Sequence, residues 1–184
     1  MGFDLKKFQK ELAQQKVYDT WQYVNSLREM LTYMNLSCDL LDKVYAQRGI
    51  KLKEKEQEIQ RKAVETGKAY VCESDLHCTD LDIAGLIIDD GFFLQKTTIE
   101  FFHYARMCSD ILFQIINAAL LGDSSFAVDD ATIINDVSNK IANYSNFITL
   151  KSLLDSNKND NLFKYIRAFD NYIKHIKTVL VTVK

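Results

Sequence analysis

Three polar side chains repeat every four residues near the C-terminus: Arg167, Asn171 and His175. Because residues four apart lie above one another on a helix, a helix here would align a guanidinium, an amide and an imidazole. A neutral imidazole can act as a general base, an amide can donate to a phosphoryl oxygen, and Lys174 or Arg167 can neutralise its charge. The combination suits metal-independent cleavage of RNA, in which the 2′-hydroxyl attacks the adjacent phosphorus.

The same row also fits a solvated polar face, because the helix dipole favours a histidine near a helix C-terminus. Projection of residues 162–180 at 100° per residue places the row opposite an apolar face, away from the main core contact of this helix. Arg167 and His175 are separated by about 12 Å along the axis. A second helix or a symmetric partner is therefore needed if both are to reach one phosphate.

The segment DNYIKH, residues 170–175, resembles the signature of the HEPN superfamily (higher eukaryote and prokaryote nucleotide-binding). That signature is an arginine, usually followed by a polar residue, with a histidine four to six residues further on. His175 matches the family histidine and Asn171 the polar residue, whereas Asp170 stands at the arginine position. The resemblance implies a small helical bundle, often dimeric, that is either a metal-independent endoribonuclease or an inactive binding domain.

Two other functions remain open. Asp39 and Asp42, three residues apart on a long helix, could bind Mg²⁺ as in the all-α nucleotide pyrophosphohydrolases, which the general plan resembles. A non-catalytic dimerisation or interaction module is the other alternative. Only the nucleotide hydrolase would need Mg²⁺; for the other functions we expect no cofactor. Glu100 and His103 form one carboxylate–histidine pair, but for His103 we expect a buried position beside Arg106 or Asp110.

The charge distribution limits the partners. The net charge of −2 argues against a strongly basic nucleic-acid coat protein. Residues 69–95 contain no lysine or arginine, whereas residues 151–184 contain seven basic and three acidic side chains, so a polyanion would contact the C-terminal part. No run of 18 apolar residues is present, which predicts no membrane span. We expect a cytoplasmic protein with reduced thiols, whose partners are a second copy of the chain and RNA or a nucleotide.

The elements that position these residues are predicted to be helices. The chain has no proline, and apolar residues recur at steps of three and four along most of it. This pattern predicts one all-α domain over residues 1–184, an antiparallel bundle of six or seven helices, two of them long. The expected parts are a long N-terminal helical region, a charged helix, a loop-rich segment, a core helix and C-terminal helices: 4–48, 50–66, 68–91, 97–121 and 129–177.

Several local signals set the expected boundaries. Gly49 predicts the end of the first helical region, and Thr97 with Glu100 predicts a capping box at the start of the core helix. A short helix is expected around residues 81–88. Asp160 is expected to cap the last helix, over about residues 161–177, and the β-branched residues that follow predict a short extended tail.

Overall fold

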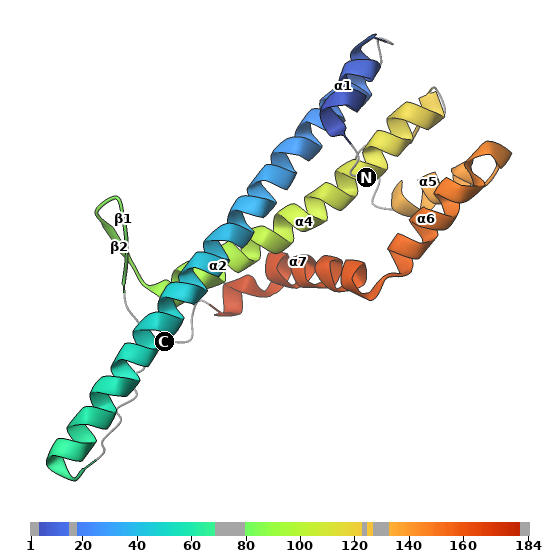
Figure 1. The fold of residues 1–184 in the computed structure, drawn as a ribbon. Coiled ribbons are helices and arrows are strands. Elements are labelled where there is room, and N and C mark those ends of the chain that lie inside the picture. The colour runs from blue at the N-terminus through green and yellow to red at the C-terminus, as the bar shows by residue number, and fades with distance from the viewer. Residues whose placement is uncertain (1–3, 15–17, 69–79, 123–124, 127–132, 181–184) are drawn as a thin grey trace. The chain divides into compact units, whose positions relative to one another are not determined.

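The computed structural model describes residues 4–14, 18–68, 80–122, 125–126 and 133–180. The chain is an all-α helical protein with two long helices, as predicted, and a small antiparallel hairpin (Figure 1). The described elements are α1 (Leu5–Gln14), α2 (Tyr18–Thr66), β1 (Leu81–Ile83), β2 (Leu86–Ile88), α4 (Asp90–Leu121), α5 (Ile133–Ile141), a 3₁₀ turn (Ser145–Phe147), α6 (Ile148–Asn159) and α7 (Asn161–Leu180). No described helix combines the length and apolar character that a membrane crossing requires.

The chain groups into two compact units. The first comprises Met1–Met34 with Phe102–Lys184, and the second comprises Asn35–Phe101. The boundaries fall inside α2 and α4, so each of these helices contributes residues to both units. The candidate site lies wholly in the first unit.

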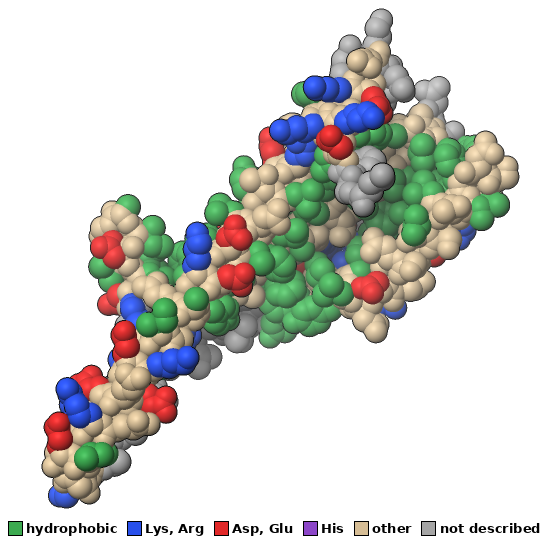
Figure 2. Space-filling model, in the orientation of Figure 1, with side chains coloured by type: hydrophobic (Ala, Val, Ile, Leu, Met, Phe, Trp, Pro, Cys, Tyr) green, Lys and Arg blue, Asp and Glu red, His purple; other side chains and the backbone are tan. Residues whose placement is uncertain are grey.

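Helix α2 is longer than expected. The prediction that Gly49 ends it is wrong, because the helix continues through Gly49 to Thr66 and includes the charged segment 50–66. A helix-interior glycine costs only about 1 kcal/mol relative to alanine, which the good helix formers around it can offset. Acidic and basic side chains alternate along the surface of this end of α2 (Figure 2), where Glu58 and Lys62 form an i, i+4 ion pair at 2.6 Å.

The hairpin replaces the short helix expected around residues 81–88. Strands β1 and β2 pair antiparallel, with Leu81 opposite Ile88. The connecting residues Ala84 and Gly85 have φ values of +53° and +84°, the signs of the type I′ turn that joins two twisted strands. Asp82 Oδ1 accepts a hydrogen bond from the Gly85 amide at 2.7 Å and closes the turn. In this second unit, Leu81 packs with Val44 and Leu94 in a small core.

Helix α4 begins at Asp90, seven residues before the predicted capping box. Asp89 Oδ1 accepts the Phe92 amide at 2.7 Å and so supplies the N-terminal cap. Thr97 is 1% exposed inside the helix, so the capping box at Thr97 and Glu100 is wrong. The Glu100 carboxylate instead pairs with Lys96 at 2.5 Å.

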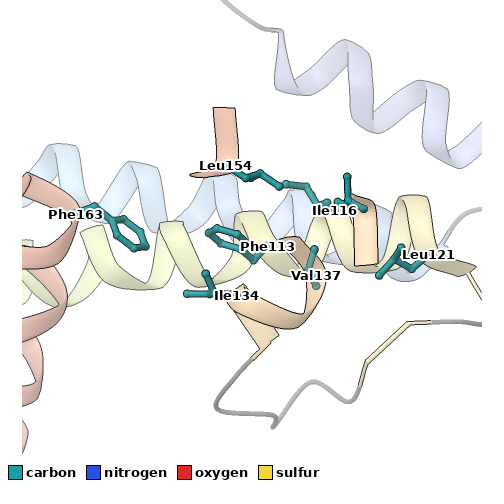
Figure 3. Packing of buried hydrophobic residues seen from close by; sticks show 8 residues of the cluster. Phe113, Ile116, Leu121, Ile134, Val137, Leu154 and Phe163 are labelled. Carbon is teal, nitrogen blue, oxygen red and sulfur yellow. The ribbon is translucent and has the colours of Figure 1, made fainter. Parts of the chain in front are cut away.

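The largest core cluster belongs to the first unit and joins α4 to α5, α6 and α7 (Figure 3). Phe113, Val137 and Ile141 at its centre are fully buried. A second cluster packs Leu12 of α1 and Val24 of α2 against Ile115 of α4. Helix α4 therefore contributes apolar residues to both clusters, as expected for a core helix.

The final helix begins as predicted. Asp160 Oδ1 accepts the amides of Leu162 and Phe163 at 2.8 and 3.1 Å, which confirms the cap. The helix then runs to Leu180, past the expected end at residue 177. Residues 178–180 of the proposed tail are thus helical, and residues 181–184 lie outside the described part.

Candidate functional site

The buried face of α7 contains a carboxylate. Asp170 is only 3% exposed, and Phe163, two turns earlier, is 7% exposed, whereas Leu162 is 64% exposed. The helical projection puts Leu162 on the apolar face that was expected to face the core, so the helix is rotated relative to that expectation. The sequence placed the polar row away from the main core contact of this helix; in the structure, Arg167 and Asn171 of that row both contact α4.

The carboxylate of Asp170 contacts three side chains. His103 Nδ1 lies 3.0 Å from Oδ1, and Arg106 Nη1 and Lys174 Nζ lie 3.0 and 2.7 Å from Oδ2. His103 and Arg106 come from α4, and Lys174 lies one turn further along α7. A buried carboxylate is stable only when its charge is compensated, and these contacts supply that compensation.

The protonation states in this cluster follow from its contacts. Burial acts to raise the pKa of Asp170, but hydrogen bonds from Lys174 and His103 and the charges of Lys174 and Arg106 outweigh it. The pKa of Asp170 therefore lies below its ordinary value, and the carboxylate is ionised. An ionised carboxylate only accepts hydrogen bonds, so Nδ1 of His103 carries the proton. Nε2 of a neutral His103 then holds the lone pair that a base requires.

Arg106 connects two residues of α7. Its Nη1 atom donates to Asp170 Oδ2 at 3.0 Å and also to the amide oxygen of Asn171, while Nε lies 3.4 Å from Asp110 of its own helix. The Asn171 amide oxygen is thus held by Arg106, which directs the amide NH₂ group away from the guanidinium. An asparagine held this way can donate to an incoming anion.

A second ion pair extends the contact between α4 and α7. Arg167 Nη1 donates to Asp110 Oδ1 at 2.9 Å, and the Arg167 guanidinium lies 5.7 Å from the centre of the Phe163 ring. We call the seven residues on these two helices the α4–α7 cluster: His103, Arg106, Asp110, Arg167, Asp170, Asn171 and Lys174. Two carboxylates face three permanent cations in it, which leaves one positive charge in surplus when His103 is neutral.

The cluster is accessible from solvent on one side. The side chains of His103 and Lys174 are 42% and 46% exposed, although the carboxylate that joins them is 4% exposed. The imidazole of His103 and the ammonium group of Lys174 can therefore contact a ligand while the Asp170 carboxylate that they share stays shielded from solvent. Charge-assisted hydrogen bonds to phosphate are the interactions that such an arrangement favours.

The structure brings together three of the four residues singled out in the sequence. Arg167, Asn171 and Lys174 all belong to the α4–α7 cluster. His175 belongs to α7 by its backbone, but its side chain lies outside the described part of the structure. Helix α4 lies beside the polar row and contacts two of its members, Arg167 and Asn171.

The sequence reasoning missed the main partner of His103. The expected partners were Arg106 or Asp110 at a buried position, whereas His103 is partly exposed and contacts Asp170, 67 residues away in the sequence. The signal that could have indicated a site is the polar stripe His103, Arg106 and Asp110, spaced three and four apart on a largely apolar stretch of helix. A polar stripe on a core helix requires polar partners on a neighbouring element.

The remaining candidate sites lie elsewhere. Asp39 and Asp42 are both exposed on α2, in the second unit. Within the described residues, no three His, Cys, Asp or Glu side chains are grouped so that they could hold a metal ion. Of the acidic segment 73–90, residues 73–79 lie outside the described part, and residues 80–90 form the hairpin and the start of α4.

Comparison of the chain with models of protein families, with curated proteins and with solved structures finds no match. Functional conclusions therefore depend on the residues of the α4–α7 cluster themselves.

Proposed function

We propose that this chain is a HEPN-like protein that binds RNA at the α4–α7 cluster and cleaves its backbone without a metal ion. The observation that carries the proposal is the contact of 3.0 Å between Asp170 and His103, because it combines an oriented, partly exposed imidazole with neighbouring cations. A carboxylate that fixes the tautomer of a histidine is a recurrent device for preparing a general base.

Each residue has a role in the proposed reaction. Nε2 of His103 accepts the proton of a 2′-hydroxyl as its oxygen bonds to the adjacent phosphorus, and the bond from phosphorus to the 5′-oxygen breaks. The 5′-oxygen takes a proton from solvent, and a 2′,3′-cyclic phosphate remains. Lys174 and the Asn171 amide stabilise the charge that develops on the phosphoryl oxygens. The alternative base is His175, the histidine of the motif, which lies on α7 together with Asn171 and Lys174.

Arg106 can compensate for the charge reversal at position 170, because it supplies a guanidinium close to that residue. The family signature has an arginine there, and this chain has Asp170. Arg106 reaches from α4 to both Asp170 and Asn171, so a guanidinium is present beside the motif although it comes from another helix. We infer that Arg106 substitutes for the motif arginine in contacting phosphate.

The test is cleavage of a labelled single-stranded RNA by the full chain in excess EDTA. We expect products that end in a 2′,3′-cyclic phosphate. Removal of a general base typically costs a factor of about 10²–10⁴, so His103→Ala should lose at least about 100-fold in rate. His175→Ala tests the alternative base, and His77→Ala, the third histidine of the chain, is the matched control.

The outcomes separate the three functions considered. Cleavage in EDTA that survives His103→Ala but not His175→Ala assigns the base to the motif histidine. Activity that requires Mg²⁺ and disappears in Asp39→Ala or Asp42→Ala would replace the proposal with nucleotide hydrolysis. An inactive chain that neither binds nor cleaves RNA would refute it and leave the interaction module.

An exposed apolar stripe on α7 favours that interaction module as a second candidate, or as a companion to the first. Leu162, Tyr165 and Tyr172 are 64%, 53% and 46% exposed, and with Phe169 they follow the spacing of three, four and three typical of helix pairing. Hydrophobic side chains also gather on the surface over α7 (Figure 2). We propose that this stripe pairs with its copy in a homodimer.

Sedimentation velocity over a range of concentrations tests the dimer. The doubly charged variant Leu162→Asp/Tyr172→Asp should sediment as a monomer where the wild type is a dimer, because charges at a helix seam oppose pairing. Leu153→Asp, which changes an equally exposed leucine of α6, is the control. A wild-type chain that stays monomeric at all concentrations would exclude this candidate.

A further inference from the structure

A short row of aromatic rings extends from the α4–α7 cluster to helix α2. The ring of Tyr104 lies 6.0 Å from that of His103, and the ring of Tyr33 lies 5.4 Å from that of Tyr104, measured between ring centres. All three residues belong to the first unit. The imidazole proposed as the base is thus the first ring of the row, and Tyr33 is the last.

Tyr33 is exposed to solvent although its ring contacts another ring. It is 44% exposed although it packs on Tyr104, so much of its surface is available to a ligand. The planes of the two tyrosines are tilted by 42°, which leaves the rings unstacked on each other. Tyr33 is linked to the cations of the α4–α7 cluster through Tyr104 and His103. Proteins bind single-stranded nucleic acid by combining cations, which hold the backbone, with exposed aromatic rings, which stack on the bases.

We propose that Tyr33 and Tyr104 form a base-stacking subsite for single-stranded RNA, next to the phosphate held by the α4–α7 cluster. The proposal depends on the proposed function, since both place RNA at this cluster. It adds a preference for unpaired RNA, because a base inside a duplex stacks on its neighbours and cannot reach Tyr33. Its test measures binding alone, so that its failure can be told apart from a failure of catalysis.

The probe is a fluorescein-labelled, single-stranded oligonucleotide with 2′-O-methyl groups, which lacks the nucleophile and cannot be cleaved. Its affinity for the full chain is measured by fluorescence anisotropy. The loss of one base–aromatic stack lowers affinity by about 5- to 100-fold. We expect that loss for Tyr33→Leu, which keeps an apolar side chain, and close to wild-type affinity for Tyr33→Phe, which keeps the ring.

Two controls make the result specific. Tyr45→Leu removes another exposed tyrosine of α2, 58% exposed and in the second unit, and should leave the affinity unchanged. The same sequence hybridised to its complement should bind more weakly than the single strand, and Tyr33→Leu should have no effect on that duplex. Circular dichroism establishes that each variant retains its helix content.

Each outcome decides the inference. Weaker binding by Tyr33→Leu, with Tyr33→Phe and Tyr45→Leu unaffected, supports the subsite. Equal binding by wild type and Tyr33→Leu, or equal binding of single strand and duplex, overturns it, even if cleavage in EDTA confirms the proposed function. Conversely, Tyr33-dependent binding by a chain that cleaves no RNA retains the subsite and rejects the catalytic role of His103.

Discussion

Asp170 of α7 holds Nδ1 of His103 of α4 at 3.0 Å, and the two residues are 67 positions apart in the sequence. The carboxylate is buried and the imidazole is partly exposed. This contact is both one of the polar links between the two helices and the basis of the proposed chemistry. The stability of the fold and the state of the site therefore depend on the same side chain.

Loss of the carboxylate should destabilise the protein. Asp170→Ala leaves Arg106, Lys174 and His103 without their shared partner, and we expect the free energy of unfolding to fall by about 2–4 kcal/mol. Urea denaturation followed by circular dichroism measures the change. Glu58→Gln, which breaks an exposed i, i+4 pair on α2, is the control and should cost less than about 0.5 kcal/mol. An equal effect of the two substitutions would contradict the central position of Asp170.

The stability should also depend on pH through Asp170. Its pKa in the folded protein is lowered, so the folded state binds fewer protons at this site than the unfolded state does. Its contribution is present above the ordinary carboxyl pKa and is lost as the pH falls through the lowered value. The difference in unfolding free energy between the wild type and Asp170→Asn should therefore shrink on acidification, as urea titrations from neutral to acidic pH can show. A constant difference would exclude the linkage.

The outer ion pair should be weaker. Arg167 and Asp110 are 28% and 43% exposed, which predicts a coupling of about 0.2–1 kcal/mol. A double-mutant cycle with Arg167→Ala and Asp110→Ala isolates it, and repetition in 1 M salt should reduce it because salt screens exposed charges. A coupling that persists at high salt would indicate that the pair is effectively buried.

The charge of Lys174 should appear in the salt dependence of RNA binding. Each phosphate neutralised on a single strand contributes about −0.7 to the slope of log affinity against log salt concentration. Lys174→Ala should therefore weaken binding and make the slope less steep by about 0.7, irrespective of sequence. Lys62→Ala, in the second unit, should leave the slope unchanged, and an identical slope for both variants would remove Lys174 from the binding surface.

A substitution at Ala84 in the hairpin turn should stabilise the protein. Ala84 is exposed and has a φ of +53°, a conformation that costs an L-residue about 1–2 kcal/mol. Ala84→Gly relieves this cost, although glycine also gains freedom in the unfolded chain, so we expect a net stabilisation of about 0.5–1 kcal/mol. Thermal unfolding measures it. Ala63→Gly in α2 is the opposite control and should destabilise, since that residue is helical.

The sequence was a good guide to features that depend on neighbouring residues. The helical class, the long helices and the cap at Asp160 follow from periodicity and from one short-range side-chain contact. The capping box at Thr97 and the stop at Gly49 were wrong because both signals lie inside helices. Tertiary packing can sustain a helix through a weak position and leave a capping motif unused.

The site was predicted less completely than the fold. The pattern correctly selected Arg167, Asn171 and Lys174 as neighbours on one helix, but the rotation of that helix depends on what it packs against. Asp170 faces inward only because Arg106 and His103 lie across from it on α4. Hydrophobic periodicity places carboxylates on the solvent-facing side of a helix, so it does not reveal a carboxylate that is buried among cations from another element.

The burial of the Asp170 carboxylate also determines which substitutions the motif can accept. Replacing Asp170 with the arginine of the family signature would not restore a family site in this chain. It would place a third permanent cation beside His103, in a space where Arg106 and Lys174 already converge, and like charges in a buried setting repel strongly. Only a reciprocal exchange, Asp170→Arg together with Arg106→Asp, would keep opposite signs in register across the two helices.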